Sequence, residues 1–285
     1  MECSEGRVTT EDGVSIFCRS WVPTEPKATI VIVHGLAEHS GRFETPARFF
    51  AERGIAAHAF DQRGHGRSPG LRVHVSSFDE YRRDLRAAIA LARLPHPGQP
   101  LFLMGHSQGG LVASTYALRE PAGLAGLVLS SPFLGLAERS RPSSFLAVTA
   151  RVLAALRPEA LFPNRLDPAL LSRDPAVGAA YAADPLVSHT VSAGWYLAAK
   201  RALADAHERA ASLRVPTLVL YAGADALVDP EATARWIDEA PREQVEAVRY
   251  DGLYHEILNA PEKDDVFRRM AAWIVRAIAS DRVME

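Results

Sequence analysis

The chain has 285 residues, a formal net charge of -2 at pH 7, 48% hydrophobic residues and 23% charged residues. This composition is typical of a soluble globular protein, and the nearly balanced charge gives no electrostatic attraction to nucleic acid, which we do not expect as a partner. The length fits one α/β core with an inserted segment.

Two sequence features bear on the location of the protein. The cysteines, Cys3 and Cys18, are too few for a disulfide framework in so long a chain and indicate a reducing compartment. The first residues lack the apolar stretch of a secretion signal, and no apolar run approaches membrane-spanning length. We therefore expect an unexported, cytoplasmic protein.

The predicted elements alternate between strands and helices. Strand-like segments 8–10 and 14–22 flank an acidic turn ending in Gly13, which predicts an antiparallel hairpin. The β-branched run 28–33 is typical of a strand buried on both faces of a parallel sheet. Helical spacing follows at 43–51 and 78–94. Further strands are predicted at 55–60, 101–104, 124–130, 215–221 and 245–250, and a closing helix at 266–278.

This alternation predicts a mostly parallel twisted sheet of about eight strands flanked by helices. Between residue 132 and about residue 210 the alternation stops, and the segment is alanine-rich, helical in its spacing and interrupted by prolines. We expect 1–132 and 211–285 to form the core, and 133–210 to form a helical cap inserted after the sixth strand.

The segment around Ser107 reads as a strand, a sharp turn and a helix in succession. A serine in such a turn has a strained backbone, so glycines two residues before and after it let the strand and the helix approach. Gly105 and Gly109 meet that need. The pattern favours a nucleophile elbow that exposes the Ser107 hydroxyl over the alternative, an ordinary glycine-rich turn.

A serine nucleophile needs a histidine and an acid, and the candidates for both roles follow Ser107 in the chain. Asp229 stands before Pro230, the arrangement of a helix N-cap. Asp225 has no such local task and follows a predicted strand closely, so we favour it as the acid over Asp229. His255 is the only histidine after residue 207.

Stabilising an oxyanion requires hydrogen-bond donors beside the nucleophile. Two backbone amides are candidates: the Gln108 N–H at the start of the predicted helix, and the Leu36 N–H where strand 28–33 opens into a loop. We expect His34 and His106 to be scaffolding beside this site.

Several segments of the chain together resemble the monoacylglycerol lipase and lysophospholipase branch of the α/β-hydrolases, a serine aminopeptidase (S33)-like family. The order Ser, Asp, His along the chain matches that fold. The resemblance covers nearly the whole chain, and 34–42 is its most specific part. The segments are 34–42 (HGLAEHSGR), 61–68 (DQRGHGRS), 105–110 (GHSQGG), 184–186 (DPL) and 223–225 (GAD).

The resemblance implies an α/β-hydrolase fold and a serine hydrolase that cleaves single-chain lipid esters, without cofactor or metal. It implies Ser107, Asp225 and His255 as the catalytic triad, and Leu36 and Gln108 as oxyanion donors. It also puts Glu38, Arg42 and Tyr181 near the alcohol end of the substrate, with a surface salt bridge or loop packing as the alternative for each.

The sequence departs from animal monoacylglycerol lipases at two positions. Leu258 stands where those enzymes carry a second histidine near the glycerol, which puts glycerol recognition in question. Val228 replaces a cysteine near the triad acid and removes no catalytic group.

A stripe of apolar residues at helical spacing runs through 145–156, with arginines around it. Leu146 and Leu153 of this stripe are candidates to line an acyl tunnel, and the basic, apolar helix is of a kind that touches a membrane surface. The alternative is that the stripe simply packs on the core.

The expected reaction is the hydrolysis of a monoacylglycerol to fatty acid and glycerol through an acyl-enzyme on Ser107. The alternatives are a lysophospholipase or a general carboxylesterase, thioesterase or peptidase of the same fold. A non-catalytic ligand-binding homologue would have no need of the complete Ser, Asp and His set. Dehalogenases and epoxide hydrolases need an aspartate at position 107.

Overall fold

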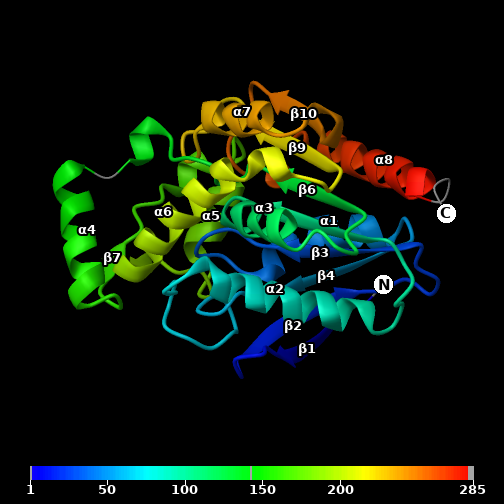
Figure 1. Ribbon diagram of the computed structural model, residues 1–285, viewed down its shortest axis with the longest axis horizontal. Helices are drawn as coiled ribbons and strands as arrows, with labels where there is room; N and C mark the ends of the chain where they lie inside the picture. Colours follow the sequence, from blue (N-terminus) through cyan, green and yellow to red (C-terminus); the bar gives the residue numbers. More distant parts are fainter. Residues whose placement is uncertain (1, 142, 282–285) are drawn as a thin grey trace.

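The computed structural model describes residues 2–141 and 143–281 and, within them, all side chains except those of 144–147, 150, 280 and 281. Its centre is an eight-stranded sheet in the order β1-β2-β4-β3-β5-β6-β9-β10 (Figure 1). Neighbouring strands are parallel except for β1–β2 and β2–β4. The strands are β1 (Ser4–Thr9), β2 (Ser15–Trp21), β3 (Ala28–Val33), β4 (Ile55–Phe60), β5 (Leu101–His106), β6 (Gly126–Ser130), β9 (Thr217–Ala222) and β10 (Val245–Tyr250).

The hairpin at the start of the chain is confirmed. Strands β1 and β2 pair antiparallel from Ser4 opposite Ser20 to Thr9 opposite Ser15. Gly13 closes the turn with a φ of 84°, a conformation that glycine adopts without the steric cost a side chain would bring.

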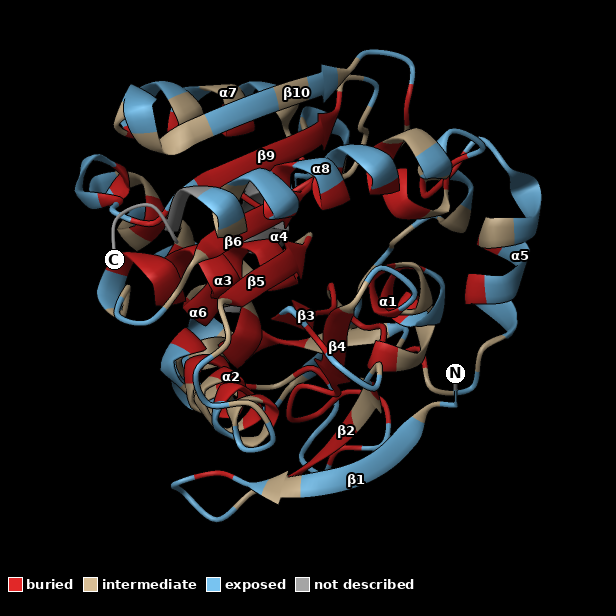
Figure 2. Cartoon of the chain, turned by 90° about the vertical axis from the view of Figure 1, so that its right-hand side faces the viewer, coloured by how far each residue is buried: buried red, intermediate tan, exposed pale blue. Residues whose placement is uncertain are grey.

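Helices cover both faces of the sheet because its central strands are apolar on both sides (Figure 2). In β3, Ile30 and Ile32 belong to one buried cluster, and Val31 and Val33 belong to the other. Helices α1 (Glu44–Ala51) and α8 (Lys263–Asp281) pack into the first cluster. Helices α2 (Phe78–Arg93), α3 (Gln108–Arg119), α6 (Ala193–Glu208) and α7 (Pro230–Glu239) pack into the second.

A largely helical insertion follows the sixth strand, as predicted. It contains α4 (Ser144–Leu156), α5 (Pro175–Ala183) and the antiparallel pair β7 (Leu161–Pro163) and β8 (Thr190–Ser192). Helix α4 stands at the end of the molecule opposite the C-terminus (Figure 1). The limits of the cap, 133 and 210, stay a prediction, since α6 lies inside that range and packs on α3 in the core.

Short 3₁₀ helices connect many of these elements. They span Ser40–Phe43, Glu138–Ser140, Pro168–Leu170, Ala210–Ser212, Arg242–Gln244 and Ile257–Asn259. Among the described residues, no helix has both the length and the apolarity that crossing a membrane requires.

Candidate active site

Ser107 occupies the sharp turn between β5 and α3. Its φ of 52° and ψ of -121° are strained for a residue with a side chain. A Cβ atom on Gly109 would collide with the carbonyl oxygen of Val33, and one on Gly105 would collide with the carbonyl oxygen of Gly109. The strand and the helix therefore meet only because both positions are glycine. The Ser107 N–H donates to the Ser130 carbonyl over 3.0 Å, which fixes the turn to the next strand.

The two candidate acids have different partners. Asp225 Oδ2 lies 2.7 Å from His255 Nδ1, and Asp225 Oδ1 accepts hydrogen bonds from the Leu227 and Val228 amides over 2.9 Å and 3.0 Å. Asp229 instead accepts the Glu231 N–H over 3.0 Å as the N-cap of α7. The structure thus brings Asp225, and not Asp229, to the histidine.

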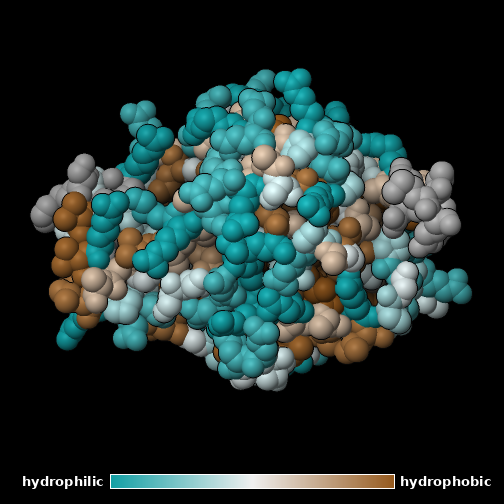
Figure 3. All heavy atoms as spheres, in the orientation of Figure 1, coloured by the Kyte–Doolittle hydropathy of each residue, from teal (hydrophilic) through white to brown (hydrophobic). Residues whose placement is uncertain are grey.

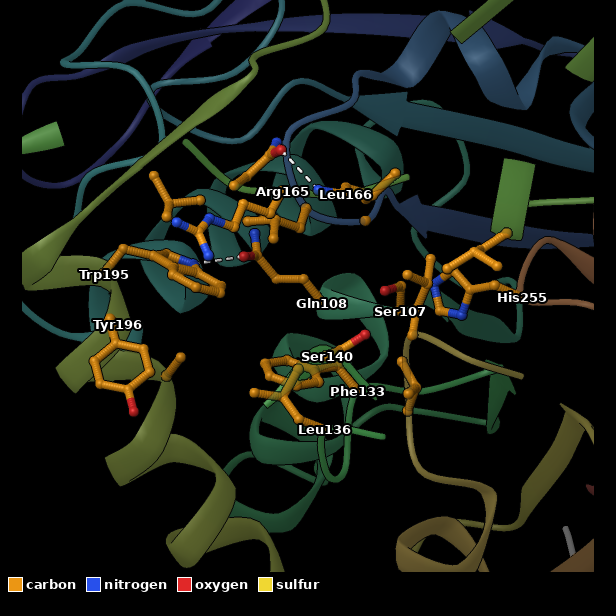
Figure 4. A pocket seen from close by; sticks show the side chains of 18 of the residues that line it. Ser107, Gln108, Phe133, Leu136, Ser140, Arg165, Leu166, Trp195, Tyr196 and His255 are labelled. Carbon is orange, nitrogen blue, oxygen red and sulfur yellow. Dashed lines mark hydrogen bonds between the residues drawn. The ribbon is translucent and has the colours of Figure 1, made fainter. Parts of the chain in front are cut away.

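Ser107 and His255 both line the cavity, Ser107 from the turn after β5 and His255 from the loop after β10 (Figure 4). Burial lowers the pKa of His255, but the Asp225, Glu256 and Glu38 carboxylates more than offset this, so the pKa is raised above its ordinary value. An imidazole in this setting accepts a proton readily, as a general base must.

The other two histidines beside the site make structural contacts. Burial, and then the neighbouring His255, lower the pKa of His106 to about 3, so its ring stays neutral. His106 Nδ1 lies 3.1 Å from the Ser130 carbonyl oxygen. His34 Nε2 accepts the Gln62 N–H over 3.0 Å. Both rings hold neighbouring strands and loops in place.

The two predicted amide donors, of Leu36 and Gln108, lie on the same cavity as Ser107. Within the described residues, neither amide donates a hydrogen bond to another protein group. The Gln108 amide is the first of α3, where the helix dipole favours negative charge. The adjacent Gly35 N–H is occupied, since it donates to Glu38 Oε1 over 2.6 Å.

A cavity of about 460 Å³ opens beside Ser107 and is mostly apolar in its lining (Figure 4). Trp195 forms part of its wall, stacks on Phe133 and donates its indole N–H to the Gln108 side chain over 2.6 Å. Farther along α6, Ala199 and Leu203 line the same wall. Leu203 is eight positions after Trp195 on this helix, so the wall is about 12 Å long.

Sequence reasoning missed Trp195, because nothing in the residues around it signals a contact with Gln108, 87 positions earlier in the chain. It also missed Glu256, which lines the cavity and binds Arg42. The signal available for Glu256 was its position directly after His255.

The three polar residues predicted near the alcohol end lie together. Glu38 and Tyr181 line the cavity, while Arg42 is not among its described lining residues. Arg42 pairs with Glu38 over 2.6 Å and lies 4.8 Å from the Tyr181 ring. The Tyr181 hydroxyl is buried and has no hydrogen-bond partner among the described residues.

The remaining predicted residues differ in their positions. Leu153 is half-buried on α4 and is not among the described residues that line the cavity. The side chain of Leu146 lies outside the described residues. Leu258 packs in the core beside α8, and Val228 lines the cavity. Within the described part of the chain, no three His, Cys, Asp or Glu side chains are placed to hold a metal ion.

The eight-stranded, mostly parallel sheet, with a serine on the tight turn after its fifth strand, defines the class: the protein is an α/β-hydrolase. A sequence model of the family described as serine aminopeptidase, S33 matches residues 24–262. The chain belongs to that family.

Individual relatives match over most of the chain. A monoacylglycerol lipase from Mycolicibacterium smegmatis is 38% identical, covering 92% of this chain and 94% of the relative. Phospholipase YtpA from Bacillus subtilis is 34% identical, and the match covers 89% of this chain and 97% of the phospholipase. The crystal structure of Paleococcus ferrophilus monoacylglycerol lipase superposes with a TM-score of 0.82 at 32% identity, covering 97% of this chain and 100% of that one.

Proposed function

We propose that this protein hydrolyses monoacylglycerols to fatty acid and glycerol. The observation that carries the proposal is a serine nucleophile elbow opening into an apolar cavity, in a chain 38% identical to a monoacylglycerol lipase over nearly its full length. The protein is accordingly a carboxylic ester hydrolase, and its substrate is a lipid ester.

In the proposed mechanism, Ser107 Oγ attacks the ester carbonyl carbon while His255 takes the hydroxyl proton, and Asp225 orients and stabilises the imidazolium. The Leu36 and Gln108 amides bind the oxyanion. Collapse of the tetrahedral intermediate breaks the bond to the alcohol oxygen, which receives the proton from His255. Water, deprotonated by His255, then attacks the acyl-enzyme, and fatty acid leaves as Ser107 is restored.

The acyl chain lies along the apolar wall formed by α6. That wall begins at Trp195, which contacts the residue after Ser107, and reaches Leu203. Each methylene buried there contributes about 0.8 kcal/mol, so a longer single chain binds more tightly until the cavity is full. A cavity of about 460 Å³ suits one chain better than three.

At the alcohol end, we propose that Glu38 and Tyr181, which both line the cavity, bind the glycerol, with Arg42 behind them. Leu258 offers no polar group there, because its side chain is aliphatic, and it is buried in the core.

A lysophospholipase is the second candidate function. It is favoured by the 34% identity to a phospholipase over 89% of this chain, and it requires the same acyl-enzyme chemistry. The two candidates differ only in the alcohol that leaves.

We also propose that residues 133–210 act as a cap over the cavity and that α4 touches a membrane surface. Val148, Val152 and Leu156 are exposed on α4, by 57%, 52% and 74%. Apolar side chains gather at this end of the molecule in Figure 3. Leu146 and Leu153 belong to the same helix and guard the entrance in this proposal.

The test is a set of initial rates on mono-, di- and triacylglycerols, lysophospholipids and short p-nitrophenyl esters, with Ser107→Ala as the blank. We expect the highest kcat/KM on monoacylglycerols and covalent labelling by a fluorophosphonate of the wild-type protein alone. Faster turnover of triacylglycerols than of monoacylglycerols would refute the single-chain substrate, and labelling of Ser107→Ala would refute the nucleophile.

A further inference from the structure

The loop that carries the Leu36 amide is held by a buried carboxylate. Glu38 Oε1 accepts the Gly35 N–H over 2.6 Å, and Glu38 Oε2 lies 2.6 Å from Arg42 Nη1. A Cβ on Gly35 would lie 2.7 Å from Glu38 Oε1 and 3.2 Å from Ser107 Cβ. The Glu38 carboxylate therefore fixes the peptide that precedes the Leu36 amide, directly against the nucleophile.

The loop that carries His255 is held by a second buried carboxylate, that of the next residue. Glu256 binds Arg42 with both oxygens, over 2.7 Å to Nη1 and 2.9 Å to Nη2. Asn259 donates to Glu256 Oε2 over 2.8 Å, and the Glu256 N–H donates to the Leu171 carbonyl over 2.7 Å. The direction of the backbone at His255 is thus set through Glu256.

One guanidinium joins the two loops. The side chains of Arg42, Glu38 and Glu256 are only 12%, 5% and 4% exposed. Breaking a buried ion pair by removing one partner is strongly unfavourable, because it leaves an uncompensated charge in a poorly solvated place. The bidentate contact between Arg42 and Glu256 fixes the relative orientation of the two side chains as well as their distance. Glu38 and Glu256 are far apart in the chain, and Arg42 is their common partner.

We propose that Arg42 is a positioning residue, which sets the separation of the Leu36 amide from the His255 imidazole by binding Glu38 and Glu256 together. The inference rests on the roles proposed above for Leu36 and His255. It differs from the role expected from the resemblance, because Arg42 acts here through two carboxylates of the protein and not on the alcohol. Arg42, Glu38 and Glu256 are called the clamp below.

The first test compares Arg42→Lys and Glu256→Gln with wild-type protein on three butyrate esters, of glycerol, ethanol and p-nitrophenol. A lysine keeps the charge but cannot bind both carboxylates in the fork geometry of a guanidinium. A small displacement of reacting groups costs on the order of 100-fold in rate, so we expect kcat to fall about 10- to 100-fold, by the same factor on all three esters, with KM unchanged. The rate of fluorophosphonate labelling should fall in parallel.

The matched control is Arg119→Lys, which loosens an exposed ion pair with Asp205 at the far end of α3 and should leave all rates unchanged. A loss confined to the glycerol ester and expressed in KM would mean that Arg42 binds the alcohol. An unchanged kcat in both clamp variants would mean that the clamp positions nothing. If wild-type protein cleaves p-nitrophenyl butyrate but not the glycerol ester, the proposed substrate fails while the clamp is still tested.

The second test is the pH profile of kcat/KM, which separates the effect of the Glu256 charge on His255 from the positioning role of the clamp. The charged groups that act on His255 are Asp225, Glu256 and Glu38, and the neutral His106 ring lies beside it. Because the Glu256 carboxylate raises the pKa of His255, Glu256→Gln should shift the acidic limb to lower pH. Arg42→Lys keeps the charge and should leave that limb in place. A loss of kcat in Glu256→Gln that follows the shifted limb, with wild-type kcat in Arg42→Lys, would assign the effect to the charge of Glu256 and overturn the proposal.

Discussion

At the scale of single residues, the site depends on the distinct tasks of two aspartates four positions apart. Asp225 reaches the histidine over 2.7 Å, and Asp229 caps a helix. Both are acidic residues in one loop, and the local sequence separates them because only Asp229 is followed by a proline at the first helical position.

We expect Asp225→Asn to lower kcat by about 10⁴, because an amide stabilises the wrong tautomer of His255. We expect Asp229→Ala to keep near-normal kcat but to cost about 1 kcal/mol of unfolding free energy, as for a lost N-cap. Steady-state kinetics and urea denaturation of both variants measure the two effects. A dead Asp229→Ala beside an active Asp225→Asn would reverse the assignment.

At the scale of elements, the features that could be predicted from the sequence are those that depend on residues close together in the chain. The elbow depends on Gly105 and Gly109 within two residues of Ser107, and β3 depends on one continuous run that is mostly β-branched, so both could be predicted from neighbours alone. The sixth strand ends where the alternation of the sequence ends, which predicted the insertion.

Contacts between distant elements could not be predicted in the same way. The Arg42–Glu256 pair joins positions 214 residues apart, and it exists only because two loops meet at one edge of the sheet. The helical spacing of α4 correctly indicated a helix, but spacing does not determine which face turns toward the cavity. Leu153 accordingly lies away from the described lining, whereas residues of α6 form the wall.

The α6 wall leads to a prediction about acyl-chain length. Leu203→Asp should lower kcat/KM on dodecanoyl and longer esters far more than on acetate or butyrate esters, because only a long chain reaches Leu203. Each buried methylene adds about 0.8 kcal/mol, so the rise of kcat/KM with chain length should stop earlier in the variant. The measurement is a series of p-nitrophenyl esters.

The control for that series is Leu94→Asp at an exposed position after α2, which should leave the chain-length profile as it is. Equal losses of Leu203→Asp on acetate and dodecanoate esters would contradict an acyl chain lying along α6.

Helix α4 leads to a second prediction at this scale. Val152→Asp should weaken sedimentation with phosphatidylcholine vesicles, because it puts a charge on the exposed apolar face that we propose touches lipid. Val275→Asp on α8 is the matched control, since Val275 is 61% exposed on a different helix and should leave vesicle binding unchanged. Equal effects of the two variants, or none, would remove α4 as the contact.

At the scale of the whole molecule, several neutral histidines are built into the fold. Burial lowers the pKa of His34 and His106 to about 3 and of His58 and His65 to about 4. In the unfolded chain these rings have an ordinary pKa near 6.5. Between about pH 6.5 and pH 4 the unfolded chain therefore binds more protons, and each ring costs about 1.4 kcal/mol of stability per pH unit as the pH falls.

Other groups oppose part of this effect. Burial raises the pKa of Asp84 to about 6 and also raises that of Glu38, so these carboxyls take up protons in the folded state as the pH falls. We still expect unfolding free energy from urea titrations to decrease steadily from pH 6.5 to pH 5. His58→Gln should flatten this slope by about one proton. An unfolding free energy that does not change between pH 6.5 and pH 5 would contradict the conclusion that these buried histidine rings stay neutral in the folded protein.

The indole of Trp195 gives the molecule a built-in optical reporter. Of the four tryptophans, Trp21, Trp236 and Trp273 lie in the core, and Trp195 alone is among the described residues that line the cavity, with its N–H on the side chain of Gln108. A ligand acyl chain that fills the cavity displaces water from the indole of Trp195 and leaves the other three indoles in unchanged surroundings. The emission of the unlabelled protein should therefore shift when a non-hydrolysable acyl ligand binds, and a Trp195→Phe variant should lose that shift, which makes each binding step visible in a stopped-flow fluorimeter.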